Sequence, residues 1–122
     1  MTIKIQTTNK RKSYKFGIMS EMIAAFFLRC KGYKIIKRNY RTRFGEIDII
    51  AQKADYIIAV EVKARVRKIA VGEILTSYQK KRIKNAFKIF LSNELYFSFG
   101  ARFDLIVIFP WQKPIHLLGF WE

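Results

Sequence analysis

The sequence predicts an α/β domain in which helices cover a mixed β-sheet. Two segments, residues 14–31 and 77–93, place apolar residues at helical spacing. Short runs rich in β-branched residues lie between and after these segments, as is typical of strands. The resulting order is helix, three strands, helix and two strands, which favours a layered α/β domain.

A chain of 122 residues can bury one hydrophobic core but not two. No repeat, low-complexity tract or interdomain linker divides it. Residues 1–13 are polar and basic, and we expect them to form a loose N-terminal arm. Residues 14–122 are then expected to form a single domain.

The first helix is predicted from about Tyr14 or Phe16 to Lys31, and Gly32 suits its C-terminal cap. Its apolar residues surround most of the helix, so we expect burial on most sides. These residues are Met19, Met22, Ile23, Ala24, Ala25, Phe26, Phe27, Leu28 and Cys30. Cys30 is therefore interpreted as a small buried residue and not as a reactive thiol.

A first strand is predicted over Tyr33 to about Arg38, followed by a basic connection over Asn39 to Phe44. Two further strands form a hairpin within residues 45–65, with a polar turn at residues 52–55. Successive side chains of a strand point to opposite faces. Glu46, Asp48 and Ile50 are therefore predicted to share one face of the first hairpin strand. Glu61 and Lys63 are predicted to share one face of the second.

A basic loop without periodicity, residues 65–72, precedes the second helix. This helix is predicted from about Ser77 to Asn93, with Thr76 or Ser77 as its N-cap. Its apolar face consists of Ile83, Ala86, Phe87, Phe90 and Leu91. The last two strands are predicted over Arg102–Phe109 and Ile115–Trp121.

The formal net charge of +15, from 24 Lys and Arg against 9 Asp and Glu, predicts a polyanionic partner. Nucleic acid is the first expectation, and an anionic membrane surface is the alternative. A single cysteine excludes an internal disulfide and indicates a reducing compartment. Glu21 interrupts the first apolar run, which is too short to span a bilayer. We therefore expect a cytoplasmic protein that is not bound to a membrane.

The charges of the hairpin fit phosphodiester hydrolysis. Mg²⁺ (or Mn²⁺) is usually held by one or two carboxylates plus water and substrate phosphate, so Asp48 and Glu61 are candidate ligands, with the Val62 carbonyl as a further one. Such a metal lowers the pKa of bound water and offsets transition-state charge. Lys63 would orient the attacking water or stabilise developing charge. The alternative is that these charges lie on an ordinary solvated face.

At these residues the chain resembles the YraN family, bacterial proteins similar to restriction-endonuclease-like, or PD-(D/E)xK, nucleases and to archaeal Holliday-junction resolvases. The matching segments are Gly17 with Glu21, Gly32–Tyr33, Arg38–Arg41, Gly45–Asp48, Val60–Arg65, Ala86 with Leu91, and Arg102–Asp104. The resemblance covers about residues 17–120. It implies a restriction-endonuclease-like core and a catalytic site of Glu21, Asp48, Glu61 and Lys63, in which Glu21 joins the metal ligands.

The chain departs from the nuclease pattern at two positions. Ile47 stands in place of the proline that gives the superfamily its name, and Gln79 stands where relatives usually have a lysine. Gln79 and Glu46 are accessory candidates. Without the resemblance, Glu21 would be interpreted as a helix-start acid favoured by the macrodipole.

Several other residues are interpreted as structural. Arg102 and Asp104 are expected to stabilise the fold, and His116 lacks the Cys or His partners that a zinc site needs. The tryptophans and phenylalanines are expected in the core and not as stacking platforms for bases.

Clusters of Lys and Arg are expected to contact phosphates without reading bases. The candidate nucleic-acid-binding residues are Arg38, Arg41, Arg43, Arg65, Arg67, Lys68, Lys80, Lys81 and Lys84. The sequence thus predicts a metal-dependent nuclease that acts on branched or end-containing DNA. The alternative is a non-catalytic nucleic-acid-binding module with a relic nuclease site. A homodimer is a further expectation, because symmetric cleavage of a junction needs two sites.

Overall fold

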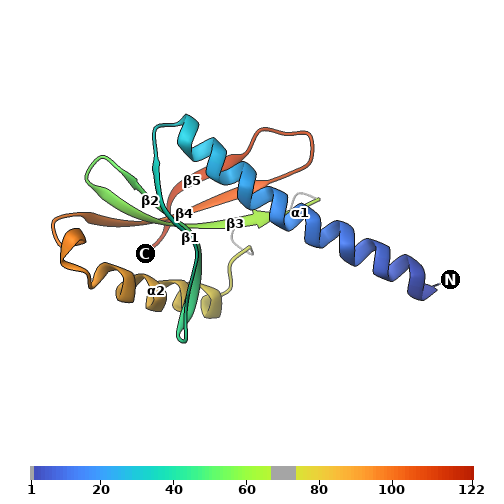
Figure 1. Cartoon of the computed structure of the whole chain (residues 1–122), viewed down its shortest axis with the longest axis horizontal. Helices are drawn as coiled ribbons and strands as arrows, with labels where there is room; N and C mark the ends of the chain where they lie inside the picture. Colours follow the sequence, from blue (N-terminus) through green and yellow to red (C-terminus); the bar gives the residue numbers. More distant parts are fainter. Residues whose placement is uncertain (1, 67–73) are drawn as a thin grey trace.

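The computed structural model describes the backbone of residues 2–66 and 74–122, and the side chains of residues 15–66 and 74–122 (Figure 1). The elements in chain order are α1 (Thr2–Cys30), β1 (Lys34–Thr42), β2 (Gly45–Lys53), β3 (Tyr56–Ala64), α2 (Ser77–Leu91), the 3₁₀ helix η2 (Glu94–Tyr96), β4 (Gly100–Ile108) and β5 (Ile115–Trp121). The predicted order of helix, three strands, helix and two strands is confirmed, with η2 as a short addition.

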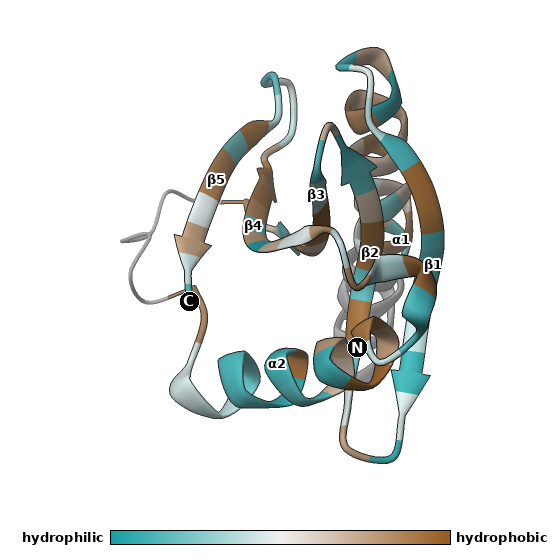
Figure 2. Cartoon of the chain, turned by 90° about the vertical axis from the view of Figure 1, so that its left-hand side faces the viewer, coloured by the Kyte–Doolittle hydropathy of each residue, from teal (hydrophilic) through white to brown (hydrophobic). Residues whose placement is uncertain are grey.

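The strands in the described part of the chain form one five-stranded sheet in the order β1-β2-β3-β4-β5. Neighbouring strands are antiparallel except β3 and β4, which are parallel. A parallel pair needs a crossover connection, and α2 lies within it. The two helices lie on opposite sides of the sheet (Figures 1 and 2). The predicted mixed sheet flanked by helices is therefore confirmed.

The central strands are hydrophobic on both sides because each face of the sheet is covered by a helix. In β3, Ile57 and Ala59 belong to the core beneath α2, whereas Ile58 and Val60 belong to the core beneath α1. The edge strand β1 instead mixes hydrophilic and hydrophobic residues (Figure 2). This contrast is the expected one between a buried strand and a strand with one open edge.

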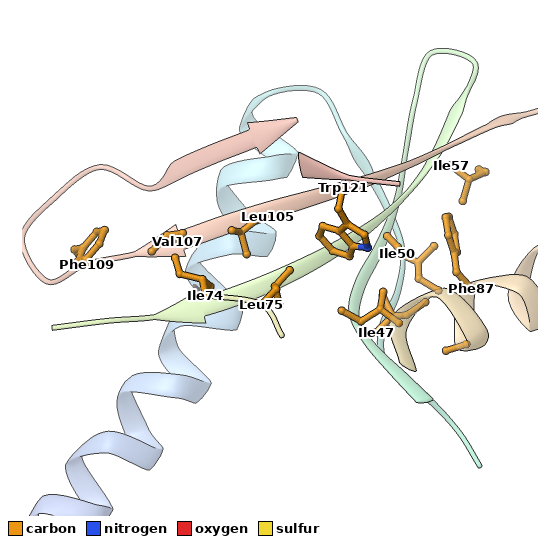
Figure 3. Packing of buried hydrophobic residues seen from close by; sticks show 13 residues of the cluster. Ile47, Ile50, Ile57, Ile74, Leu75, Phe87, Leu105, Val107, Phe109 and Trp121 are labelled. Atoms are coloured by element: carbon orange, nitrogen blue, oxygen red, sulfur yellow. The ribbon is translucent and has the colours of Figure 1, made fainter. Parts of the chain in front are cut away.

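The core beneath α2 is the larger of the two clusters. Figure 3 shows Phe87 of α2 beside Ile50, with Ile47 and Trp121 nearby. All five predicted apolar residues of α2 contact this core, as buried or partly buried side chains. The predicted Thr76 cap is also confirmed, because the side chains of Thr76 and Gln79 each accept a hydrogen bond from the other's backbone N–H.

The first helix differs from its prediction in length. It begins at Thr2, so the backbone of residues 2–13, predicted as a loose arm, continues the helix. This segment contains no glycine or proline, the two residues that most disfavour a helix interior. Its amino-terminal part projects beyond the sheet (Figure 1).

The first helix also differs in burial, because it contacts the sheet along one side only. Ala24, Ala25 and Leu28 are buried there. Phe27 is partly buried against the core beneath α1. The other apolar residues predicted as buried are exposed: Met19 and Met22 at 56%, Ile23 at 39% and Phe26 at 67%, together with Cys30. The prediction of burial on most sides was therefore wrong. A wide apolar stripe shows that a helix can pack, but it does not show how much of the stripe is covered.

One connection differs from its predicted bounds, and a second cannot be compared. β1 continues to Thr42 through the segment predicted as a basic connection, and the turn is reduced to Arg43 and Phe44. The predicted basic loop, residues 65–72, lies mostly outside the described residues. None of the helices in the described residues is long and apolar enough to cross a membrane.

Gly45 allows the first hairpin to approach α2 closely. A Cβ at this position would lie 1.8 Å from the carbonyl oxygen of Arg82, whereas a Cβ on Gly17 would meet no described atom within 4 Å. We predict that Gly45→Ala destabilises the protein by about 1–3 kcal/mol, because the backbone of α2 must move. The control Gly17→Ala should stabilise α1 by about 1 kcal/mol. Urea unfolding measures both, and an unchanged free energy of unfolding for Gly45→Ala would contradict the close packing.

Candidate functional site

The pairing between β2 and β3 ends before the two strands do. It runs from Lys53–Tyr56 to Ile49–Val60. Beyond this point the Val62 N–H donates a hydrogen bond to Asp48 Oδ2 at 2.8 Å. A side-chain carboxylate therefore satisfies a donor that a regular ladder would pair with a backbone carbonyl.

The alternation of side chains along β2 is interrupted at Asp48. Ile47 belongs to the core beneath α2 and Ile49 to the core beneath α1, although a regular strand would place both on one face. The shared face predicted for Glu46, Asp48 and Ile50 is therefore wrong in one respect. Ile50 lies in the core, whereas the two acids line a cavity.

The neighbouring strand β1 is irregular at the same level. The pairs Arg38–Ile49 and Tyr40–Ile47 place Asn39 beside Asp48. Asn39 has a φ of 52°, in the left-handed region that Asn tolerates better than most residues. Its side chain lies close enough to Glu21 of α1 to lower the pKa of that acid. Asn39 therefore connects the first helix to the edge of the opening.

A cavity of about 650 Å³ lies at this opening. Residues from both helices and from β1, β2 and β3 line it: Gly17, Ile18, Ser20, Glu21, Asn39, Arg41, Glu46, Asp48, Glu61, Val62, Lys63, Ala64, Gln79, Arg82 and Ile83. Helices on opposite faces can share a cavity only where the sheet between them is open. All predicted catalytic and accessory residues are in this lining.

Glu61 and Asp48 form a pair of adjacent carboxyl groups. Burial, then a hydrogen bond with Asp48 and its charge, raise the pKa of Glu61 to about 9, and the charge of Lys63 only partly opposes this rise. The raised pKa favours the protonated form of Glu61 at neutral pH. A divalent cation that binds between the two carboxyl groups would displace this proton.

Glu21 acts on the same site from α1. Burial and then the charge of Asp48 raise its pKa, while Arg38, Asn39 and Arg41 oppose the rise. The residues that the structure describes contain no group of three His, Cys, Asp or Glu side chains placed to hold a metal ion. The pair of Asp48 and Glu61 still matches the one or two carboxylates that usually bind Mg²⁺.

The predicted nucleic-acid-binding residues are distributed unevenly around the cavity. Arg41 lines it, and Arg38 lies close enough to influence Glu21. Arg43 lies over the Phe44 ring, and Arg65 donates to the Ala64 carbonyl. Lys80, Lys81 and Lys84 lie on α2 outside the described lining of the cavity, while Arg67 and Lys68 lie outside the described residues.

Two lining residues were missed by the sequence analysis. Arg82 follows Gln79 by three residues on α2, and this helical spacing was a usable signal. Asn39 could have been suspected only as a residue that tolerates a positive φ.

Comparison with known proteins identifies the family. Residues 20–108 match the model described as Uncharacterised protein family UPF0102. The chain belongs to this family. A UPF0102 protein of Mesorhizobium japonicum is 39% identical over 112 residues, covering 91% of this chain and 90% of the relative. One of Bartonella bacilliformis is 39% identical over 119 residues (97% and 98%), and one of Rhizobium meliloti is 41% identical over 111 residues (90% and 91%).

The UPF0102 match confirms the family to which the sequence motifs pointed. The matched range contains Glu21, Asp48, Glu61 and Lys63. It also contains Gln79, which lines the cavity and whose side-chain oxygen caps α2.

A second polar cluster in this UPF0102 chain lies around Asp104, which is fully buried. Its carboxylate accepts hydrogen bonds from Arg102 (Nε and a terminal nitrogen, both 2.8 Å), from the Gly119 N–H at 2.9 Å and from His116 Nε2 at 2.8 Å. Burial raises the pKa of Asp104, but these hydrogen bonds outweigh it and lower the pKa. Arg102 also donates to the Tyr33 hydroxyl at 2.9 Å.

The Asp104 cluster connects β4, β5 and the residue that precedes β1. His116, interpreted from the sequence as lacking partners, is part of this cluster through Asp104. The interpretation of Arg102 and Asp104 as structural agrees with this geometry.

The raised pKa of Glu61 makes a prediction about stability in metal-free buffer. Between pH 5 and 9 the folded protein keeps a proton that the unfolded chain releases near pH 4.5. Stability should therefore fall as pH rises through this window, by at most about 1.4 kcal/mol per pH unit for one proton.

Glu61→Gln should remove this fall of stability with rising pH. Glu46→Gln, which changes an exposed acid of the same cavity, should retain it. Urea unfolding at pH 6, 7 and 8 with a chelator measures the slopes. If stability changes equally with pH in the wild-type and Glu61→Gln proteins, the raised pKa of Glu61 is contradicted.

Proposed function

We propose that this chain is a metal-dependent nuclease that hydrolyses DNA phosphodiester bonds. The observation that carries the proposal is that the carboxyl groups of Asp48 and Glu61 lie with Lys63 in one cavity where the sheet opens. Each of these residues has a role that hydrolysis of a phosphodiester requires.

Asp48 and Glu61 would hold Mg²⁺ or Mn²⁺, because hard oxygen ligands suit these ions. The Val62 carbonyl is a further candidate ligand, and Glu21 adds negative charge from α1. When bound, the ion lowers the pKa of a water molecule and offsets charge on the reacting phosphate. Asp48 stays oriented throughout, since the Val62 N–H holds one of its oxygens.

The cations of the cavity would act on the substrate. Lys63 follows Glu61 by two residues on β3, so both side chains point to the same side of the sheet. Its ammonium would orient the attacking water or stabilise charge that develops on the phosphate. Arg41 and Arg82 line the same cavity and would position the DNA backbone.

The proposed substrate is branched or end-containing DNA, and the net charge of +15 supports a polyanionic partner. A non-catalytic nucleic-acid-binding module remains the second candidate. The acid pair argues against binding alone, because it places negative charge where a phosphate must approach. Symmetric cleavage of a junction would require two copies of the chain, and this dimer stays a prediction.

Amide substitutions separate the two functions. Asp48→Asn and Glu61→Gln should abolish metal-dependent cleavage, because each removes a ligand charge while keeping the shape. Metal-free DNA affinity should increase for Asp48→Asn, since repulsion of the phosphate falls. It should stay equal for Glu61→Gln, because the raised pKa keeps Glu61 uncharged without metal. Lys63→Ala should stop cleavage with a modest loss of affinity. Gel assays on duplex, single-stranded, flap and four-way-junction DNA measure cleavage with each metal.

The matched controls are Glu94→Gln and Lys88→Ala, at exposed positions on η2 and in the last turn of α2. Both should cleave as the wild type does. The nuclease proposal fails if the wild type cuts none of the substrates and calorimetry finds no divalent-cation binding that the amide variants lose.

Binding should also depend steeply on salt. Each phosphate neutralised by a Lys or Arg lowers log K by about 0.9 per tenfold increase in salt on B-DNA. Fluorescence anisotropy at roughly 50 to 200 mM salt, in the absence of metal, measures the slope of log K against log salt concentration. An affinity that hardly changes with salt would argue against recognition through the phosphates.

A further inference from the structure

Two exposed aromatic residues lie beside the cavity, each with an arginine on its ring. Phe44, at the tip of the β1–β2 hairpin, is 54% exposed, and the Arg43 guanidinium carbon is 5.4 Å from its ring centroid. Tyr78, in the first turn of α2, is 68% exposed, and the Arg82 guanidinium carbon is 5.9 Å from its ring centroid. The sequence analysis expected phenylalanines in the core, so the position of Phe44 is a correction.

The two aromatic residues belong to the same rim of the cavity. Gly45 directly follows Phe44 and lies against the backbone of Arg82, which itself lines the cavity. Tyr78 is one turn before Arg82 and directly precedes Gln79, another lining residue. The hairpin tip and the start of α2 therefore meet beside the carboxylates.

Both backbone segments are held in place by side-chain hydrogen bonds. Thr42 Oγ1 accepts the N–H groups of Phe44 and Gly45 at 3.1 Å each and donates to the Gly45 carbonyl at 2.9 Å. The turn that carries Tyr78 begins with the reciprocal cap of Thr76 and Gln79. Two preorganised rings can receive a flat ligand without ordering a loop first.

We propose that Phe44 and Tyr78 form a stacking platform for unpaired bases beside the scissile phosphate. Every base offers a π-face, so such a platform tolerates any sequence, and bases inside a duplex are not available to it. Arg43 and Arg82 place positive charge next to each ring, where the adjoining phosphates would lie. The preferred substrate is then DNA in which a duplex meets single-stranded nucleotides. The location of the scissile phosphate rests on the proposed function.

The first test is binding without metal. Fluorescence anisotropy compares a single-stranded oligothymidine, a flap and a blunt duplex, and 2-aminopurine in the unpaired arm reports stacking. Phe44→Ala and Tyr78→Ala should each weaken binding to the single strand and flap about five- to 100-fold. They should leave the blunt duplex within about twofold and reduce the change in 2-aminopurine emission. Phe44→Trp and Tyr78→Phe should restore binding, because they keep the ring.

The matched control is Phe97→Ala, which removes a ring that is 69% exposed, just after η2. Its binding should equal that of the wild type, and circular dichroism should show that all variants are folded. The platform is ruled out if the alanine variants lose affinity equally for all three DNAs, if they lose none, or if Phe97→Ala loses as much.

The outcome is separable from that of the proposed nuclease. Wild-type protein that binds unpaired bases through both rings, but cuts nothing and shows no divalent-cation binding that the amide variants lose, would refute the nuclease and retain the platform. Cleavage that depends on Asp48 and Glu61, with a substrate preference unchanged in both alanine variants, would retain the nuclease and refute the platform.

Discussion

The hydrogen bond from the Val62 N–H to the Asp48 carboxylate is the interaction on which the cavity depends. β2 and β3 stop pairing after Ile49 and Val60, and continued pairing would close the sheet. Asp48 satisfies the backbone donor that the separation leaves free, so the sheet opens without an unpaired amide. The same carboxyl group lies close enough to Glu61 to raise the pKa of Glu61. One side chain thus stabilises the opening and supplies half of its acid pair.

The features that could be predicted from the sequence are those that depend on short-range spacing. The two-residue separation of Glu61 and Lys63 places both in the cavity because alternation along a strand is a local property. The Thr76 cap and the apolar face of α2 are local in the same sense. The position of Asp48 next to β3 is also predictable, because a short hairpin joins the two strands. Glu21 was identified by family resemblance, since its helix position alone indicated only a favourable terminal charge.

The features that could not be predicted depend on how distant segments meet. The exposure of Met22 and Phe26 depends on which side of α1 the sheet reaches, and periodicity does not contain this information. The contact between Asp104 and His116 depends on a register shift between β4 and β5. The left-handed backbone of Asn39 lies beside Asp48, where the alternation of β2 is interrupted, and this pairing of distant segments is a tertiary property.

The raised pKa of Glu61 has a consequence for how the protein folds. In many small metalloproteins the cation assembles the fold, so a chain made when metal is scarce stays unfolded. Here the acid pair neutralises itself in part, and the strands around it are already held by Val62 and by the two cores. We therefore expect the chain to fold without a cation. An ion that binds as proposed would displace a proton in a finished cavity, so its supply would regulate chemistry and not the amount of folded protein.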